Sequence, residues 1–163
     1  MFINFYMPID KKFQTQYKHY LLQSSYAALT VFFLTMILNW HHAVSISSIG
    51  AMAFIVFSMP KSYSSKSGRI IGGHIIGFIV GCIFSIFPYI DLLFFAALWY
   101  GLAVGVSFIL MSITDTEHPP AIGTAVGMTI VGYSHTVAIG ISLSILILVL
   151  IHKQLKPYIQ DLV

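Results

Sequence analysis

The 163-residue chain contains six apolar segments in succession, and a short polar stretch separates each segment from the next. Four segments are long (20–40, 70–87, 92–113 and 137–151) and two are short (44–59 and 119–133). A run of about 20 apolar residues is long enough for a helix to cross a bilayer. Only 8% of the residues are charged, against about a quarter in soluble domains. We predict an all-α, polytopic membrane helix bundle in which residues 1–163 form one transmembrane domain, with the lipid bilayer as its partner.

The basic residues indicate how the segments cross. If all six segments cross and the N-terminus is cytoplasmic, every Lys and Arg falls on the cytoplasmic side, as is usual in membrane proteins. These residues are Lys11, Lys12, Lys18, Lys61, Lys66, Arg69, Lys153 and Lys156. We therefore predict a bundle in the inner (plasma) membrane of a bacterium with both termini in the cytoplasm, and residues 1–19 as an interfacial lead-in. A helix of roughly 16 residues rises only about 24 Å, so complete crossing by the short segments requires some extended or broken backbone.

The two halves of the chain, 20–88 and 89–156, each contain a long, a short and a long segment. The short segments contain the similar strings Ile49-Gly50-Ala51-Met52-Ala53 and Ile122-Gly123-Thr124-Ala125-Val126. A repeat of three crossings has to be inverted across the membrane, and such repeats place a binding site between their interrupted helices. Because apolar, glycine-rich segments also match by chance, a 3+3 inverted repeat and a coincidence both stay open.

A dense polar cluster lies between the fourth and fifth segments, where Asp115, Glu117 and His118 precede Pro119 and Pro120. Tandem prolines fit the first turn of a helix, where their missing N–H groups have no partner within the helix. We therefore expect a helix to begin at about Pro119, with its positive dipole end beside His118. In a membrane protein this combination marks a candidate site.

Two ordered stretches carry a family resemblance. The first is His118-Pro119-Pro120, and the second is Gly50-Ala51-Met52-Ala53 followed by Pro60, Arg69 and Gly72-Gly73-His74. Together they resemble the HPP family of small integral membrane proteins. The chain departs from the family where Ala121-Ile122-Gly123 replaces the usual Gly-Gly-Ala, and where the loop before Arg69 lacks the usual Gln-Pro. The resemblance implies a role in membrane transport, with nitrite as the substrate linked to photosynthetic members.

For a small inorganic anion, most of all nitrite, the positive end of the helix is the first candidate binding element. The expected substrate-binding residues are His118, Pro119, Pro120, Gly123, Thr124, Ser47, Ser48, Gly50, His74 and Arg69. Taken singly, His118 can instead cap its helix, His74 can bond a neighbouring helix and Arg69 can be a topology charge. Asp115 and Glu117 would repel an anion unless they are protonated, paired with Arg69 or used as proton carriers.

Other classes of function are weaker but distinct. A divalent metal transporter would use His118, the two acids and His41-His42, although these residues have no defined ligand geometry. A non-transporting scaffold would need the glycines for packing alone. The sequence shows no nucleophile triad, paired carboxylates or cofactor loop, so we expect no enzyme, cofactor or resident metal, and no nucleic-acid partner. Cys82 is the single cysteine, which excludes a disulfide within the chain, and self-association stays open.

Overall fold

The computed structural model describes residues 11–38, 43–87 and 93–163, and every regular element in this part of the chain is helical. The elements are α1 (Lys11–Leu38), α2 (Ala43–Ser58), the 3-10 turn η1 (Tyr63–Ser65), α3 (Ser67–Ser85), α4 (Leu93–Ile113), α5 (Pro119–Val131) and α6 (His135–Leu155). The predicted all-α bundle is therefore confirmed. Residues 11–19 of the predicted lead-in belong to α1, which has a kink at Gln16 (φ −125°, ψ 19°).

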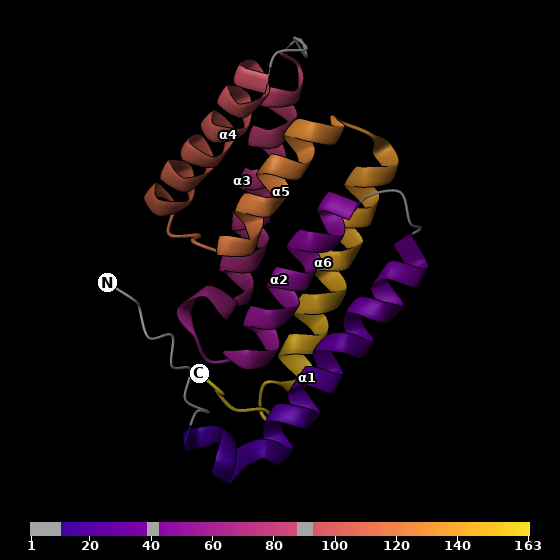
Figure 1. Ribbon diagram of the computed structural model, residues 1–163, viewed down its shortest axis with the longest axis vertical. Helices are drawn as coiled ribbons and strands as arrows, with labels where there is room; N and C mark the ends of the chain where they lie inside the picture. The colour runs from indigo at the N-terminus through magenta and orange to yellow at the C-terminus, as the bar shows by residue number, and fades with distance from the viewer. Residues whose placement is uncertain (1–10, 39–42, 88–92) are drawn as a thin grey trace, which may run out of the picture.

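Consecutive helices run in alternating directions, so that α1, α3 and α5 point one way and α2, α4 and α6 point the other (Figure 1). The start of α1, the loop 59–66 and the C-terminus lie at the same end of the bundle (Figure 1). Within the described ranges, three helices are long and apolar enough to cross a membrane, in Ser67–Ser85, Phe94–Ile113 and His135–Leu155. Helices α2 and α5 contain the shorter apolar stretches Ser47–Ser58 and Pro119–Val131. The expected first span, 20–40, lies largely in α1, and α1 is not one of these three helices. Residues 39 and 40 of that span are outside the described ranges.

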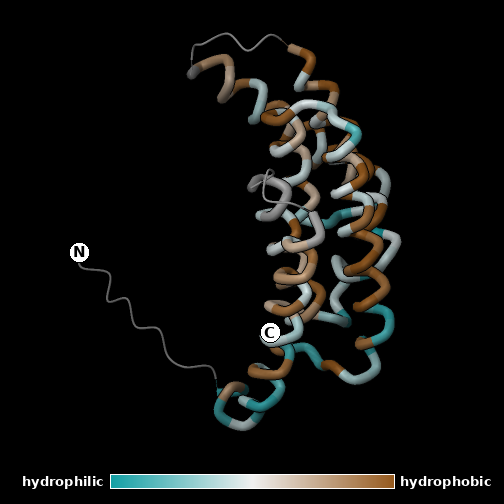
Figure 2. Tube along the Cα trace, turned by 90° about the vertical axis from the view of Figure 1, so that its right-hand side faces the viewer, coloured by the Kyte–Doolittle hydropathy of each residue, from teal (hydrophilic) through white to brown (hydrophobic). Residues whose placement is uncertain are grey.

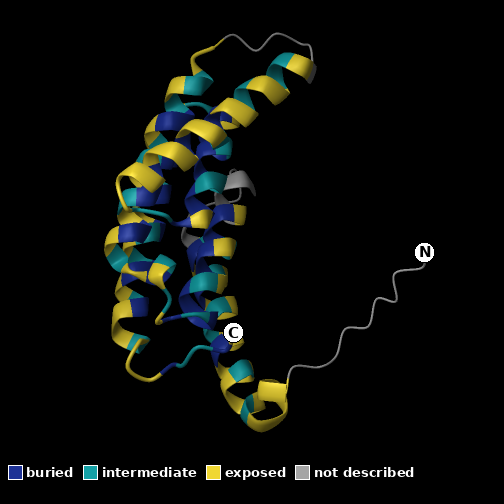
Figure 3. Cartoon of the chain, turned by 90° about the vertical axis from the view of Figure 1, so that its left-hand side faces the viewer, coloured by how far each residue is buried: buried dark blue, intermediate teal, exposed yellow. Residues whose placement is uncertain are grey.

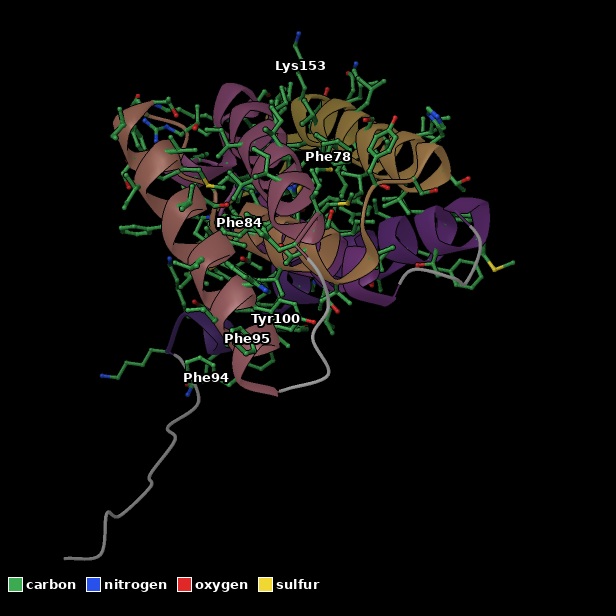
Figure 4. All side chains as sticks on the ribbon, turned by 90° about the horizontal axis from the view of Figure 1, so that it is seen from above. Phe78, Phe84, Phe94, Phe95, Tyr100 and Lys153 are labelled. Carbon is green, nitrogen blue, oxygen red and sulfur yellow. The ribbon has the colours of Figure 1, made fainter. Side chains whose placement is uncertain are left out.

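Large apolar side chains cover the outside of the bundle. On α4, Phe94 is 70% exposed and Ile113 is 75% exposed, and similar residues follow the outward faces of α3 and α6 (Figure 3). Apolar colouring continues along the helices, whereas hydrophilic positions gather in the loop regions (Figure 2). Viewed along the bundle, the charged Lys153 side chain points away from it (Figure 4). Soluble monomers rarely expose apolar area on this scale, so these faces are suited to lipid.

Helices α3 and α5 pack in close backbone contact because glycines of α3 face α5. A Cβ atom added at Gly81 would lie 2.5 Å from both the carbonyl oxygen of Ala125 and Cβ of Met128. A Cβ atom at Gly77 would overlap the carbonyl group of Ala121. Small residues of this kind allow membrane helices to approach closely. The glycines of α3 therefore let α5 lie directly against its backbone.

The last residues of the chain fold back against the loop end of the bundle, a feature the sequence analysis did not anticipate. The N–H of Leu162 donates to the Ser58 carbonyl at 2.8 Å, and the amide of Gln23 donates to the Gln160 carbonyl at 2.9 Å. Ile159 and Leu162 are buried in the process. This segment therefore ties α1, α2 and the end of α6 together.

Candidate functional site

Three helices bring their polar side chains together inside the bundle. Ser48 of α2, His74 of α3 and Thr124 of α5 are all buried, as is His118, which immediately precedes α5. The Thr124 hydroxyl lies 2.8 Å from Nδ1 of His74 and 2.9 Å from the Ser48 hydroxyl. His74 is seven residues into α3, which places it about 10 Å along that helix from its start near the loop end. The cluster is therefore well inside the apolar bundle.

The hydrogen bonds of this cluster assign its protons. The Ser48 hydroxyl donates to the Pro120 carbonyl at 2.7 Å, because a carbonyl can only accept. Because the single hydroxyl hydrogen of Ser48 is used in that bond, Thr124 donates to Ser48. The Thr124 oxygen then accepts from Nδ1–H of His74. The second ring nitrogen of His74, Nε2, consequently carries a lone pair, and it is buried with no hydrogen-bond partner. The His74 ring thus bonds a neighbouring helix, as one of its two expected roles requires, and one ring nitrogen has no partner.

His118 has the same arrangement. Its Nδ1–H donates to the Ser64 carbonyl at 2.8 Å, so its Nε2 is the lone-pair nitrogen, which is buried without a partner. The rings of His74 and His118 lie 5.2 Å apart between centroids. Burial lowers the pKa of His118 to about 4, and the bond to Ser64 opposes that shift only in part. His118 is the N-cap residue of α5, but its ring makes no capping bond to that helix.

Helix α5 begins at Pro119, as the tandem prolines predict. Pro119 and Pro120 have no N–H, and the N–H of Ala121 donates to the His118 carbonyl at 2.9 Å. The start of α5 therefore offers its dipole but no free N–H from these three residues. An anion bound here would depend on side-chain donors more than the sequence suggested.

Arg69 forms an ion-pair cluster of its own. Its guanidinium pairs with Glu117, and Nη2 lies 2.5 Å from Oδ1 of Asp115. Tyr63 completes the cluster: its ring lies under the guanidinium, with 3.1 Å between Cζ and the ring centroid, and its hydroxyl donates to Asp115 at 2.6 Å. Of the three roles considered for the two acids, the structure has the pairing with Arg69. The Arg69 charge is thereby neutralised, which weakens its assignment as an anion ligand.

The sequence did not single out Tyr63 or Ser64. Tyr63 is the only aromatic residue in the basic loop 61–69, and that isolated position was the available signal. Nothing in the sequence indicates that the carbonyl of Ser64 receives the His118 proton, because the contact depends on how the loop folds back.

A surface groove of about 430 Å³ adjoins the cluster between α2 and α5. Its walls include the expected residues Ser47, Ser48, Pro119, Pro120 and Gly123. A Cβ atom added at Gly123 would lie 3.4 Å from Cβ of Ser48, so this glycine sits directly against α2.

Gly50 does not belong to this groove. It borders a second groove of about 420 Å³ whose walls include Gln23 and Ala27 of α1 and Phe57 of α2, and a Cβ atom there would meet nothing within 4 Å. Helix α2 also begins at Ala43, so Ser47, Ser48 and Gly50 lie within the helix and not at an open helix start. Gly50, one of the expected substrate-binding residues, therefore lies apart from Gly123, and α2 does not begin at the groove. The string Gly50-Ala51-Met52-Ala53, which carries part of the HPP resemblance, is helical throughout, and Gly50 borders the groove beside α1.

The residues expected to bind a divalent metal are not brought together as one site in the described part of the chain. Among the residues that the structure describes, no group of three or more His, Cys, Asp or Glu side chains is placed to hold a metal ion. His41 and His42 are outside the described ranges. In the described residues, the lone pairs on Nε2 of His74 and Nε2 of His118 are available to bind a cation.

Apolar helices with lipid-suited outer faces and a buried polar cluster define an integral membrane protein. The chain belongs to the HPP family: the model described as "HPP, transmembrane region" matches residues 13–156. A transmembrane protein of Dictyostelium discoideum is 36% identical over 83 residues, which are 50% of this chain and 28% of that protein. The match thus covers less than a third of the relative's length. No solved structure matches the chain.

Proposed function

We propose that this HPP-family protein is a transporter or channel for a small inorganic anion, with nitrite as the first candidate. The observation that carries the proposal is the buried cluster of Ser48, His74, His118 and Thr124 beside the groove between α2 and α5. Polar and ionisable groups within membrane segments are costly, and they commonly belong to substrate pathways. Buried polar side-chain atoms usually have a hydrogen-bond partner, and Nε2 of both histidines has none.

The groove supports a small substrate. Its wall is mainly apolar, with hydroxyl groups from Ser47 and Ser48 and the positive end of α5 on one side. Gly123 keeps the space beside Ser48 open, because any larger side chain at that position would project against α2.

Counterflow in liposomes that contain the purified protein tests this proposal. Nitrite, nitrate, formate and chloride are each loaded inside, and uptake of labelled anion is compared with protein-free liposomes, because nitrous acid crosses lipid unaided at low pH. We expect protein-dependent exchange of nitrite above that baseline. An absence of exchange for all four anions would remove the anion proposal.

A divalent-metal transporter is the second candidate, and one observation favours it. In both histidines Nδ1–H donates to an oxygen while Nε2 is free, which is the usual arrangement of an imidazole that binds a metal. Flux of divalent metal ions in the same liposomes separates the two candidates. Metal flux would fall on acidification, because protons compete for the same nitrogens. A scaffold protein, the third class, would show no flux of either kind.

A further inference from the structure

We propose that His74 and His118 together form a proton-binding site, so that each anion enters the protein accompanied by one proton. The inference rests on the proposed anion transport and assigns its coupling ion. A role as proton carriers was one of the alternatives for Asp115 and Glu117, but both carboxylates are paired with Arg69.

The geometry provides the place for the proton. Each imidazole is fixed by its Nδ1–H bond, to Thr124 in one case and to the Ser64 carbonyl in the other. Each therefore presents a buried nitrogen that can only accept, and the two rings are neighbours at 5.2 Å between centroids. A proton taken up on one Nε2 turns that atom into an N–H donor, which is the group an anion needs and which the neutral cluster does not offer.

The charged groups near His74 and His118 decide whether binding of the proton and binding of the anion favour each other. Helices α2 and α5 contain no Asp, Glu, Lys, Arg, Tyr or Cys, so on these two elements only the dipole of α5 acts on the pair. On α3 the other titratable residues are Arg69, which is ion-paired, and Cys82. From the loops, Tyr63, Asp115 and Glu117 all engage Arg69 or one another, and the Lys66 ammonium lies over the Tyr63 ring. Helix α6 also packs against α3, and its His152 bonds the Pro60 carbonyl through Nε2.

The Ser48 and Thr124 hydroxyls and the two neutral imidazoles carry no charge at rest, so the cluster itself is neutral. A proton alone would be an uncompensated buried charge, and so would an anion alone, and each is costly in a low-dielectric interior. Bound together they form an ion pair, with the proton moving from water to Nε2 and the anion accepting its hydrogen bond. The loaded site is again neutral, so the transfer of one monovalent anion moves no net charge.

Proton uptake during nitrite binding tests the inference without interference from membrane leakage. Calorimetric titration of nitrite into detergent-purified protein, repeated at pH 7 in buffers of different ionisation enthalpy, gives the number of protons taken up. Linkage predicts about one proton per bound nitrite, and an affinity that weakens about tenfold for each unit of rise in pH.

Asparagine substitutions separate this role from a structural one. His74→Asn and His118→Asn retain a side-chain N–H in place of Nδ1–H but remove Nε2. Either variant is expected to keep the wild-type melting temperature within a few degrees, while proton uptake falls towards zero and nitrite affinity loses its pH dependence. His135→Asn, at an exposed residue, is the matched control and keeps both properties.

The outcomes distinguish the two proposals. If nitrite binds with no proton uptake, the proton-site inference is overturned and anion transport stands. If wild-type protein takes up a proton but both variants do so equally, the site lies elsewhere and the assignment to these histidines is overturned. If nitrite does not bind at all, the nitrite proposal fails and the inference fails with it.

Discussion

The two short helices, α2 and α5, contain similar strings around Gly50 and Gly123, yet their surroundings differ. Gly123 lies against Ser48, whereas Gly50 faces an open groove towards α1. The glycines of α3 also pack closely against α5. No such close contact is made at Gly50, where an added Cβ atom would meet nothing within 4 Å. Similar apolar strings therefore border a buried polar cluster in one helix and an open groove in the other, according to the helix packed against them.

The contact between α3 and α5 has the largest expected effect on stability. Gly77→Leu would drive a side chain into the backbone of Ala121, so we expect little folded, monodisperse protein. Gly101→Leu on α4 is the matched control, because a Cβ atom there meets nothing within 4 Å. Size-exclusion chromatography and thermal unfolding in detergent measure both variants. Equal behaviour of the two variants would contradict the close packing of α5.

The acid stability of the protein reports on His118, which precedes α5. Its pKa is lowered from 6.5 to about 4 in the folded protein, mainly by burial. As the pH falls from 6.5 towards 4, the unfolded chain takes up a proton that the folded protein refuses, so the free energy of unfolding decreases. His118 contributes at most about 3 kcal/mol to this decrease. Denaturant titrations at several pH values measure it, and His118→Asn is expected to flatten the slope. An unchanged slope in that variant would show that His118 titrates normally.

The hydroxyl of Thr124 links α2 and α3 through α5. Thr124→Val conserves shape but leaves Nδ1–H of His74 without an acceptor, at a cost of about 1–3 kcal/mol. Thr129→Val on the same helix is the control, because its hydroxyl bonds only to the Ala125 carbonyl of its own helix. Unfolding measurements should place Thr124→Val clearly below Thr129→Val. Similar values would mean that the polar chain across the three helices contributes little.

The sequence predicts the helical elements well because the length and apolarity of a segment decide whether it can be a membrane helix. The start of α5 at Pro119 is equally readable, since tandem prolines fit little else. Contacts between segments that are distant in the sequence are harder to predict. The pairing of Arg69 with Asp115 and Glu117, the docking of residues 159–162 and the direction of Gly50 depend on how distant segments pack, and local composition does not encode that. The number of crossings, their orientation and the inverted repeat stay predictions.

Uptake of labelled nitrite by liposomes containing Gly123→Leu or Gly50→Leu tests the central claim most directly. Both variants introduce the same side chain into a short apolar helix, but only the one at Gly123 fills the groove against Ser48. With equal amounts of folded protein, we predict that Gly123→Leu loses most of its uptake and that Gly50→Leu retains uptake near the wild-type rate. Retained uptake in Gly123→Leu, or a loss in Gly50→Leu that equals it, would contradict a substrate path between α2 and α5.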